Sequence, residues 1–370
     1  MRRSAGIRRI GVLTGGGDAP GLNPVLRAIV HRALGEYGWE VWGSEDGMEG
    51  LIQPPRCRKM QRLTLASVAD ILPRGGSFLG CSKDANPWAY PQHKRGGKVE
   101  FVDVHAQVLR HVKHYGLDAL LMIGGDGTMT MARRFADLGL RVVGVPKTID
   151  NDLSATDYTF GFDTAVATAT WAIDTLHATA HAHDRVLIVE LMGREAGWIA
   201  LSAGIAGGAH VILLPEIPYD IDRVVRKIRS LGGRYSSYCV IVVAEGAKPK
   251  GGDVSIVAKG RDGHLARLGG AGQRVADALS GRVAHEVRVT VLGHLQRGGS
   301  PTAFDRILGT RLGTAAVDLA AQGGFGRMVC LRTPYIESVA FEEAIGHNKR
   351  VDPTGELVRT ARAMGIELGA

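Results

Sequence analysis

The sequence predicts an α/β fold with mostly parallel sheets, because short apolar runs alternate with helical patterns along the chain. Two of these runs, residues 119–123 and 142–145, have the length and composition of buried strands. A helical pattern begins between them at Met129, so the three segments form one strand–helix–strand crossover. Ligands of open parallel sheets bind at the carboxyl ends of strands, and the loops after these two runs are therefore the expected place for a site.

The loop after the first run is GGDGT, residues 124–128. Gly124, Gly125 and Gly127 let the backbone approach a bulky anion, because a Cβ atom would block it. The N–H groups that open the next helix would then face phosphates. Asp126 would repel a phosphate in direct contact, but it suits a Mg²⁺ ion held between the two, since hard cations favour carboxylate oxygen.

The loop after the second run is PKTIDND, residues 146–152. Asp150 and Asp152 flank Asn151, and one of these carboxylates could take a proton from an attacking hydroxyl group. For either loop alone, the alternative is a tight turn with solvated aspartates and a helix N-cap. Two such loops one crossover apart favour a binding site over that alternative.

Composition sets the broad class of the protein. A chain of 370 residues can bury a large core and predicts two lobes, and its 45% hydrophobic and 22% charged residues are ordinary for a globular protein. The net charge of +8 and the pI near 9.4 are compatible with nucleic-acid binding. However, the basic residues are scattered without interleaved aromatics, and binding of substrate phosphates accounts for the charge equally well. We expect no nucleic-acid partner.

The cysteines and the N-terminus predict a cytoplasmic protein without a membrane partner. The four cysteines lie far apart and form no CxxC pair, which argues against a zinc site or a disulfide framework. The basic N-terminus lacks an apolar signal core, because residues 15–18 (GGGD) interrupt the run. No apolar stretch reaches the roughly 20 residues that a membrane-spanning helix needs.

The first strand is expected over residues 10–14, followed by a glycine-rich turn over 15–21 and an amphipathic helix over 22–37. The turn has neither GxGxxG nor GK[ST] spacing, so close strand-to-helix packing is the alternative to a phosphate loop. Residues 73–83 form another glycine-rich loop. The polar, irregular stretch 84–100 predicts a surface excursion.

Strands and helices continue to alternate along the rest of the chain. Expected strands are 185–191, 211–214, 239–244, 288–292 and, as the last one, 328–331; expected helices are 102–115, 162–181, 219–231, 304–322 and the C-terminal tail, with a charged glycine-rich loop over 248–267. His177 and His181 lie one helical turn apart with His183 nearby, a spacing that could bind a metal ion. No carboxylate or cysteine motif accompanies them, so ordinary helix-end histidines are favoured.

A cluster of cationic residues follows the strand expected over 288–292. A histidine and two arginines, here His294 with Arg288 and Arg297, can together clamp a dianionic phosphate. For Arg288 alone, the alternative is a surface ion pair.

These motifs carry a family resemblance. MIGGDGT with PKTIDND resembles the phosphofructokinases, the kinases that phosphorylate fructose 6-phosphate at its 1-hydroxyl group. Further matches are VLTGGGDAPGLN (12–23), Met192-Gly193-Arg194, Ala244-Glu245-Gly246 and VLGHLQRGGSP (291–301). GGDGT alone also occurs in NAD kinases and lipid kinases, whereas PKTIDND followed by GHLQRGGSP is specific.

The resemblance implies a particular architecture. It predicts two similar Rossmann-like lobes, each with three layers and a mostly parallel sheet, and an active site in the cleft between them. The ATP-binding lobe would comprise residues 1–161 and 296–346, and the sugar-phosphate lobe residues 162–295 and 347–370. A homodimer or homotetramer is implied, with active sites completed across an interface.

The resemblance also implies residue roles. The donor ATP would be bound by Gly17, Lys83, Gly125, Asp126, Gly127 and Thr128. Lys83 stands where the family usually has an arginine, so it keeps the charge but lacks the bidentate fork. Asp150 would act as the base, Asp126 and Asp152 would hold Mg²⁺, and Arg194 and Thr148 would stabilise the transferring phosphoryl group.

The sugar phosphate would be bound by residues from both halves of the chain. They are Thr148, Ile149, Asp150, Arg185, Met192, Gly193, Arg194, Glu245, Arg288, His294, Leu295, Gln296 and Arg297. Arg185 resembles an arginine that reaches the sugar phosphate from a neighbouring subunit.

Two positions bear on the phosphoryl donor. Family members that use ATP have glycine at the position of Gly127, and pyrophosphate users have an aspartate that occupies the place of the ATP α-phosphate. Lys147 instead favours pyrophosphate, because family members that use pyrophosphate have lysine at this position and regulated ATP-dependent bacterial members have glycine. We give Gly127 more weight because it acts by steric and charge exclusion, and we expect ATP, with pyrophosphate as the alternative.

Regulation is expected to be weak. Regulated bacterial members carry two arginines one turn apart on the first helix, and here Arg27 is followed by His31. The lysines before the Glu245 strand are replaced by residues 236–238 (SSY). We therefore predict little control by phosphoenolpyruvate or ADP.

Two other functions compete with this interpretation. An NAD kinase or lipid kinase would rest on GGDGT alone, and the cluster of Arg288, His294 and Arg297 argues against it. A non-catalytic phosphosugar or nucleotide sensor would not need Asp126, Asp150 and Arg194. Sedoheptulose 7-phosphate remains open as a second acceptor.

Overall fold

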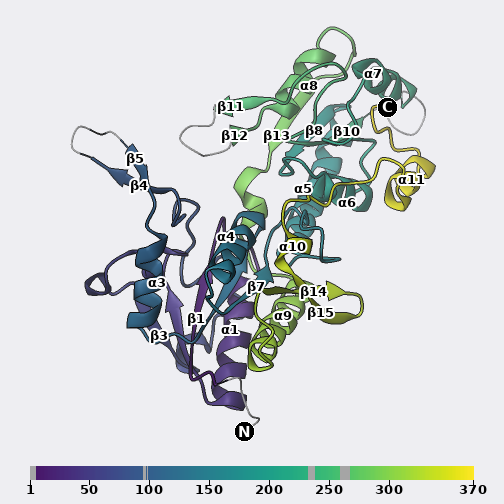
Figure 1. The fold of residues 1–370 in the computed structure, drawn as a ribbon. Coiled ribbons are helices and arrows are strands. Elements are labelled where there is room, and N and C mark those ends of the chain that lie inside the picture. Colours follow the sequence, from purple (N-terminus) through teal and green to yellow (C-terminus); the bar gives the residue numbers. More distant parts are fainter. Residues whose placement is uncertain (1–5, 95–96, 98, 232–237, 259–266) are drawn as a thin grey trace. The chain divides into compact units, whose positions relative to one another are not determined.

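The computed structural model describes residues 6–94, 97, 99–231, 238–258 and 267–370. The chain divides into two compact units (Figure 1). Unit 1 comprises Met1–Ile149, Leu153–Gly161 and Arg297–His347, and unit 2 comprises Asp150–Asp152, Phe162–Gln296 and Asn348–Ala370. Within the described residues, no helix is long and apolar enough to span a membrane.

Unit 1 is built on one large, mostly parallel sheet. Its described strands have the order β15-β14-β7-β6-β1-β2-β3, where β1 is Arg9–Thr14, β2 Glu40–Ser44, β3 Met60–Leu63, β6 Ala119–Gly124, β7 Val142–Pro146, β14 Arg327–Arg332 and β15 Tyr335–Ala340. The five central strands are parallel, and the edge strands β3 and β15 are antiparallel to their neighbours.

Alternation along the strands explains why helices cover both faces of this sheet. In β6, Leu121 and Ile123 pack with α1 (Leu22–Arg32) and α9 (Ala303–Ala321), whereas Leu120 and Met122 pack with α3 (His105–His114) and α4 (Asp126–Asp137). Successive side chains of a strand point to opposite faces, so an entirely apolar strand needs a helical layer on each side. The short helices α2 (Glu49–Ile52) and α10 (Phe341–Ala344) join the α3 and α4 layer.

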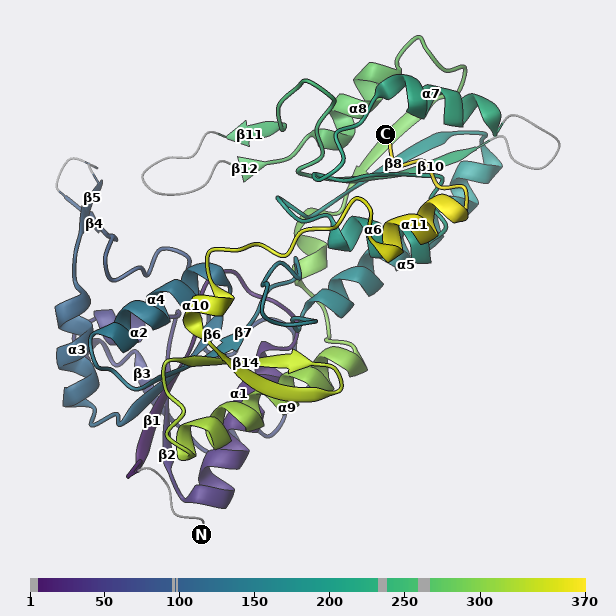
Figure 2. The same ribbon diagram turned by 45° about the vertical axis from the view of Figure 1, so that its right-hand side comes forward.

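Unit 2 has a smaller parallel sheet. Its described strands have the order β13-β8-β10-β9, with β8 at Val186–Leu191, β9 at Val211–Leu213, β10 at Cys239–Ala244 and β13 at Val287–Val291. Helices α7 (Ile221–Ser230) and α8 (Ala271–Leu279) pack on one face, and α5 (Phe162–Ala182) and α6 (Trp198–Ala206) lie against these strands as well (Figure 2). Helix α11 (Glu356–Ala363) contacts α6.

The α/β class and the parallel sheets are confirmed, with local corrections. Helix α4 begins at Asp126 rather than Met129, because the Gly125 carbonyl accepts the N–H groups of Thr128 and Met129. The expected surface excursion contains a hairpin of β4 (Tyr90–His93) and β5 (Val99–Val102), so α3 begins at His105 instead of residue 102. The strand expected as the last is followed by β15.

Other elements were missed because their patterns are short or polar. The sequence interpretation lacked β2, β3, α6 and α8, as well as β11 (Ile256–Ala258) and β12 (Arg267–Leu268) within the expected loop 248–267. The expected helix 22–37 is an α-helix to Arg32 and a π-helical turn over Ala33–Tyr37.

Candidate active site

The glycine-rich loops of unit 1 leave three neighbouring strands at one edge of the sheet. Strands β1, β6 and β7 are adjacent and parallel, so the loops that follow them meet. The Gly15 N–H donates to the Ile123 carbonyl (2.8 Å), and the Lys147 N–H donates to the Gly124 carbonyl (2.9 Å). These bonds prolong the sheet ladder into the loops and fix all three relative to one another.

The glycines of these loops serve two different purposes. A Cβ atom at Gly15 or Gly124 would collide with the side chain of Thr128, which is buried in the first turn of α4. These two glycines therefore permit close packing within the protein. Gly127 differs, because among the described residues no atom beyond its chain neighbours and its own helix backbone lies within 4 Å of its Cβ position. The first turn of α4 thus has open space at Gly127, where a ligand can approach.

Lys147 is a buried lysine at the end of β7. Its side chain is only 4% exposed, and its Nζ donates to the Gly17 carbonyl at 2.5 Å. A buried ammonium is costly unless backbone or side-chain acceptors surround it. Lys147 therefore links the loop after β7 to the loop after β1, a structural role that would serve either phosphoryl donor.

Gly17 also lies beside two other cationic side chains. Its Cβ position is 3.2 Å from Lys83 Cε and 3.1 Å from Arg297 Nη1. Arg297 donates from Nη1 to the Asp18 carbonyl (3.1 Å). The structure thus places Arg297 at the glycine loop after β1, although the sequence predicted it in a sugar-phosphate clamp.

Asp126 is the carboxylate at which a metal ion was expected. It is half-buried, and its Oδ1 accepts the Gly346 N–H at 3.0 Å. Across the described residues, no three His, Cys, Asp or Glu side chains gather as a metal cage. A single carboxylate beside open space fits Mg²⁺ only together with substrate phosphates, which is how this ion is commonly bound.

The PKTIDND loop is ordered by contacts on either side. The Thr148 carbonyl accepts the Thr159 hydroxyl (2.7 Å), and Ile149 is fully buried. Within unit 2, Lys349 Nζ donates to Asn151 Oδ1 (3.0 Å), and the Lys349 N–H donates to the Asp152 carbonyl (2.7 Å). Asp150 lies directly between these two anchored parts of the loop.

The sugar-side residues of unit 2 gather at the carboxyl edge of its sheet. The Met192 N–H donates to Gln296 Oε1 (3.3 Å), and the Gly246 N–H donates to the Gly193 carbonyl (3.1 Å). A Cβ atom at Gly246 would overlap the Arg194 carbonyl, so glycine is required there. The loops after β8, β10 and β13, which carry Arg194, Glu245 and His294, are thereby held together.

Exposure differs among the residues of the turn after β13. His294 and Leu295 are exposed, and Leu295 remains 66% accessible. Gln296 is fully buried, and besides accepting from Met192 it donates to the Gly293 carbonyl (3.2 Å). Gln296 therefore holds the turn in place, while His294 is free to contact a ligand.

Arg185 and Arg288 lie at the opposite, amino edge of the same sheet. Arg185 Nε donates to Glu286 Oε2 (2.6 Å), and Arg288 Nη2 pairs with Glu286 Oε1. The two guanidinium groups, Arg185 first, lower the pKa of Glu286. Within one chain, β13 separates Arg288 from His294, so one copy does not bring the two together, and their predicted phosphate role stays a prediction.

His177 is engaged by protein groups at the end of α5. Its Nε2 lies 2.7 Å from the Gly207 carbonyl and its Nδ1 lies 3.3 Å from the Tyr238 hydroxyl. The Tyr238 ring also lies edge-on to His181 and His210. Burial lowers the pKa of His210 to about 4. Ser236 and Ser237 lie outside the described residues.

Comparisons with known proteins agree with these loops. The sequence profile of the family described as Phosphofructokinase matches residues 9–320. The chain belongs to this family. It is 51% identical over 362 residues to the ATP-dependent 6-phosphofructokinase of Chloroflexus aurantiacus, covering 98% of both chains.

Two further relatives show the range of the family. The chain is 50% identical over 346 residues to the pyrophosphate–fructose 6-phosphate 1-phosphotransferase of Amycolatopsis mediterranei, covering 93% of this chain and 96% of that one. Among solved structures, phosphofructokinase from Pichia pastoris in the T-state has a TM-score of 0.77 at 28% identity, covering 98% of this chain and 37% of that one.

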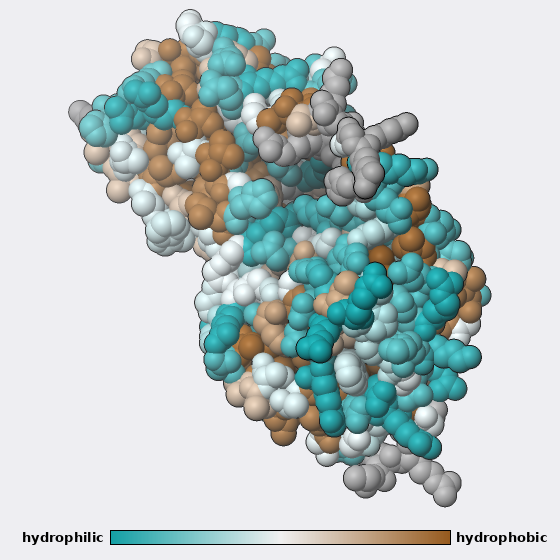
Figure 3. Space-filling view, turned by 90° about the vertical axis from the view of Figure 1, so that its left-hand side faces the viewer, coloured by the Kyte–Doolittle hydropathy of each residue, from teal (hydrophilic) through white to brown (hydrophobic). Residues whose placement is uncertain are grey.

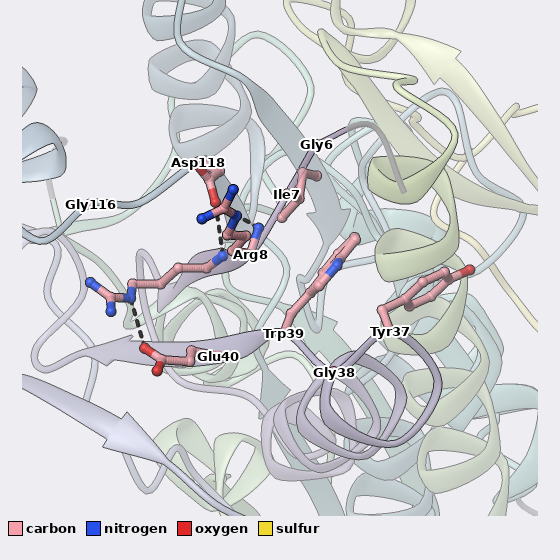
Figure 4. A pocket seen from close by; sticks show the side chains of 10 residues that line it. Gly6, Ile7, Arg8, Tyr37, Gly38, Trp39, Glu40, Gly116 and Asp118 are labelled. Carbon is pink, nitrogen blue, oxygen red and sulfur yellow. Dashed lines mark hydrogen bonds and ion pairs between the residues drawn. The ribbon is translucent and has the colours of Figure 1, made fainter. Parts of the chain in front are cut away.

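A cavity of about 690 Å³ in unit 1 lies away from the glycine loops (Figure 4). Its lining includes Arg8, Arg9, Trp39, Glu40 and Asp118, at the amino ends of β1, β2 and β6. Arg9 Nε donates to Glu40 (2.8 Å), and the Arg8 N–H donates to Asp118 (2.7 Å). The cavity is therefore at the edge opposite to the phosphofructokinase motifs.

The sequence missed two residues that hold the site loops, namely Lys349, which bonds Asn151 and Asp152, and Gly346, which bonds Asp126. Their contacts lie far away along the chain from the motifs they support, and no local pattern marks them.

The α3 face of unit 1 is mostly hydrophilic (Figure 3), with exposed Arg110 and Lys113, which suits a solvated surface.

Proposed function

We propose that the chain is a 6-phosphofructokinase that transfers the γ-phosphoryl group of ATP to the 1-hydroxyl group of fructose 6-phosphate. The observation that carries this proposal is the meeting of three loops, GGGD, GGDGT and PKT, at the ends of adjacent parallel strands. Relatives at about 50% identity that are named ATP-dependent 6-phosphofructokinases support it.

Each loop has a role in the proposed reaction. Gly17 and the first turn of α4 position the donor phosphates, with Lys83 and Arg297 beside them. Asp150 takes the proton from the 1-hydroxyl group of the sugar phosphate, and Thr148 and Arg194 stabilise charge on the transferring group. Asp126, with Asp152, would hold Mg²⁺, which neutralises charge on the donor phosphates when bound. Such reactions depend mainly on positioning and electrostatics.

ATP is the proposed donor because Gly127 leaves open space at the first turn of α4. Pyrophosphate is the second candidate, favoured by Lys147 and by the name of the Amycolatopsis mediterranei relative. Since Lys147 bonds the Gly17 carbonyl and so has a structural role, we give it less weight than Gly127.

The position of Arg185 and Arg288 supports an oligomer. They lie at the amino edge of the unit 2 sheet, and the six residues of β8 separate them from Met192–Arg194 by about 20 Å. One sugar phosphate cannot span this distance. We therefore assign these arginines to the active site of a second copy, as in a homodimer or homotetramer.

The activity is tested by initial rates with fructose 6-phosphate and Mg²⁺, comparing ATP with pyrophosphate, on wild type and Asp150→Asn. We expect fructose 1,6-bisphosphate with ATP and a loss of about 10²- to 10⁴-fold in the variant, the usual contribution of a general base. Faster turnover with pyrophosphate would overturn the donor assignment, and no turnover with either donor would overturn the proposed function.

Subunit sharing has a separate test. Asp150→Asn and Arg185→Ala are each purified in inactive form, mixed, dissociated and reassociated. A shared site predicts that the hybrid regains activity, because one of its sites then carries both wild-type residues. Absence of recovery after verified subunit exchange would place Arg185 in the site of its own chain.

A further inference from the structure

A short segment before α11 is bonded to two of the proposed site loops. We call residues 348–351 (NKRV) the strap; Figure 2 shows it within the extended yellow stretch that precedes α11. Its four residues all bond to other parts of unit 2, and none of them belongs to a motif of the family resemblance. The strap could therefore support catalysis without touching the substrate.

Lys349 contacts the base loop, our name for residues 150–152, which include the proposed base Asp150. Its Nζ donates to Asn151 Oδ1 (3.0 Å) and its backbone N–H donates to the Asp152 carbonyl (2.7 Å). Its own carbonyl accepts the indole N–H of Trp198 (2.8 Å), the first residue of α6. One residue thus joins the loop that carries Asp150 to the start of the helix that follows the Arg194 loop.

The neighbours of Lys349 bind the Arg194 loop itself. Asn348 Nδ2 (3.1 Å) and Arg350 Nη2 (2.7 Å) both donate to Glu195 Oε2. Glu216 Oε1 accepts the N–H groups of Gly197 (2.9 Å) and Val351 (2.8 Å). The strap is therefore bonded along its whole length, and Lys349 can fix the base loop against a well-anchored support.

Asn151 shows why the base loop needs such a support. Its backbone has a φ of +52°, in the left-handed region that residues other than glycine rarely adopt. Asparagine tolerates this conformation better than most residues, but the loop still gains nothing from a helix or strand ladder there. The 4% exposed Asn151 side chain and its bond to Lys349 hold the turn that places Asp150.

We propose that Lys349 is a positioning residue for phosphoryl transfer, which fixes the Asp150–Asp152 loop relative to the Arg194 loop through Asn151. The inference rests on the proposed function, since Asp150 and Arg194 are its catalytic groups. Lys349 acts in this proposal by holding the Asn151 side chain and the Asp152 carbonyl. Its effect should therefore fall on kcat, while binding of the donor at unit 1 is unchanged.

The test compares Lys349→Met, Asn151→Gly and the double variant with wild type and with Lys227→Met. Asn151→Gly keeps the left-handed backbone but removes the amide that accepts the Lys349 bond. Lys227 is the matched control, because its Nζ donates to the Gly365 carbonyl (2.9 Å) from α7, and no site loop is involved.

We expect both single variants to lower kcat roughly 10- to 100-fold, the scale for misplacing a catalytic group by about 1 Å, with KM for ATP unchanged. The double variant should be no slower than the slower single variant, because both single variants remove the same hydrogen bond between Lys349 Nζ and Asn151 Oδ1. Lys349→Arg should recover part of kcat, and Lys227→Met should leave kcat unchanged.

Three results would overturn the inference: an unchanged kcat in Lys349→Met, losses that multiply in the double variant, or an equal loss in Lys227→Met. Should Lys349→Met fail to fold, Asn151→Gly tests the same bond from its other end. An inactive wild type would instead refute the proposed function, so the two failures are distinguishable.

Discussion

At the carboxyl edge of the unit 1 sheet, where the glycine-rich loops lie, Lys147 is a buried basic residue. At the carboxyl edge of the unit 2 sheet, the comparable residues are the carboxylates Glu190 and Glu216. Lys147 donates to the Gly17 carbonyl. Glu190, which is 3% exposed, accepts the N–H groups of Gly270 (3.0 Å) and Gly272 (2.8 Å), at the start of α8. In both units, backbone groups hydrogen-bond a buried polar side chain: the Gly17 carbonyl accepts from Lys147, and two N–H groups at the start of α8 donate to Glu190.

The two ligands of the proposed reaction both carry phosphates, so these buried side chains support the two edges in different ways. A cation behind the loops of unit 1 makes the potential there more positive, which favours the phosphates of a donor. The carboxylates of unit 2 orient N–H groups and so fix the loops that carry charged side chains toward a sugar phosphate. The comparison teaches that the donor edge relies on backbone and glycine, and the acceptor edge on braced side chains.

The largest effect on stability is expected from Glu190→Leu. Two N–H groups, that of Gly270 partly buried and that of Gly272 buried, would lose their acceptor. At about 1–3 kcal/mol for each unsatisfied group, the free energy of unfolding should fall by about 2–6 kcal/mol. Glu190→Gln keeps one acceptor oxygen and should lose about half as much. Urea unfolding measures both, and equal stability of Glu190→Leu and wild type would break the comparison.

A smaller loss is expected from Lys147→Met, because the Gly17 carbonyl would lose the hydrogen bond from Lys147 Nζ. The free energy of unfolding should fall by about 1–3 kcal/mol. Because the loop after β1 would also shift, KM for ATP should rise while KM for fructose 6-phosphate stays near the wild-type value. If KM rose for fructose 6-phosphate and not for ATP, Lys147 would instead support binding of the sugar phosphate.

A pH effect of modest size is expected at Glu216. Burial raises the pKa of its carboxyl above the ordinary 4.5, against the opposing N–H bonds from Gly197 and Val351. The folded protein therefore binds this proton more tightly than the unfolded chain, and the stability that the group contributes is lost as pH rises from 4.5 through the raised pKa. The unfolding free energy of wild type should decline relative to Glu216→Gln over this range, and parallel curves would contradict the assignment.

The smallest effect is expected from phosphoenolpyruvate or ADP as regulators. Partial burial and the Arg27 charge lower the pKa of His31, so this residue adds no second cation at neutral pH. Initial rates at subsaturating fructose 6-phosphate should change less than about twofold with either effector, a difference of only about 0.4 kcal/mol. A several-fold change would show that an effector site survives without those cations.

The sequence predicted the elements in which every residue is buried. The runs that became β6, β7 and β10 are apolar throughout, and β8 departs from this only at Glu190, since helices cover both sides; such runs stand out without any structural knowledge. Strand β3 lies at a sheet edge with two of its four residues buried, and its sequence, MQRL, does not differ from a loop. The edge strands β3 and β15 and the β4–β5 hairpin were therefore missed, whereas the more apolar edge strands β9 and β13 were predicted.

In the candidate site, too, the sequence predicted local features but not contacts between distant segments. Motifs located the loops at the strand ends, because glycine and carboxylate spacing is local. Arg288 and His294 are near each other in sequence, but β13 separates them within one chain, which the sequence alone did not indicate. Contacts between distant segments, such as Lys349 with Asn151 or Glu286 with Arg185, depend on tertiary packing and leave no local pattern.

The most direct test of the comparison is calorimetric binding of ATP and of fructose 6-phosphate to wild type, Gly127→Asp and Arg194→Ala. Beyond its own helix backbone and chain neighbours, no described atom lies within 4 Å of the Gly127 Cβ position, so an aspartate fits there but repels a nucleotide phosphate. ATP affinity should fall about tenfold or more in Gly127→Asp, since each ~1.4 kcal/mol of repulsion is a factor of ten.

We expect the affinities for the two ligands to change in opposite ways in Gly127→Asp and Arg194→Ala. Gly127→Asp should keep its affinity for fructose 6-phosphate, and Arg194→Ala should lose that affinity while binding ATP as wild type does. Gly127→Ala, which adds no charge, is the control and should bind both ligands normally. Unchanged ATP binding by Gly127→Asp, or loss of both ligands together in either variant, would contradict the division into a donor edge and an acceptor edge.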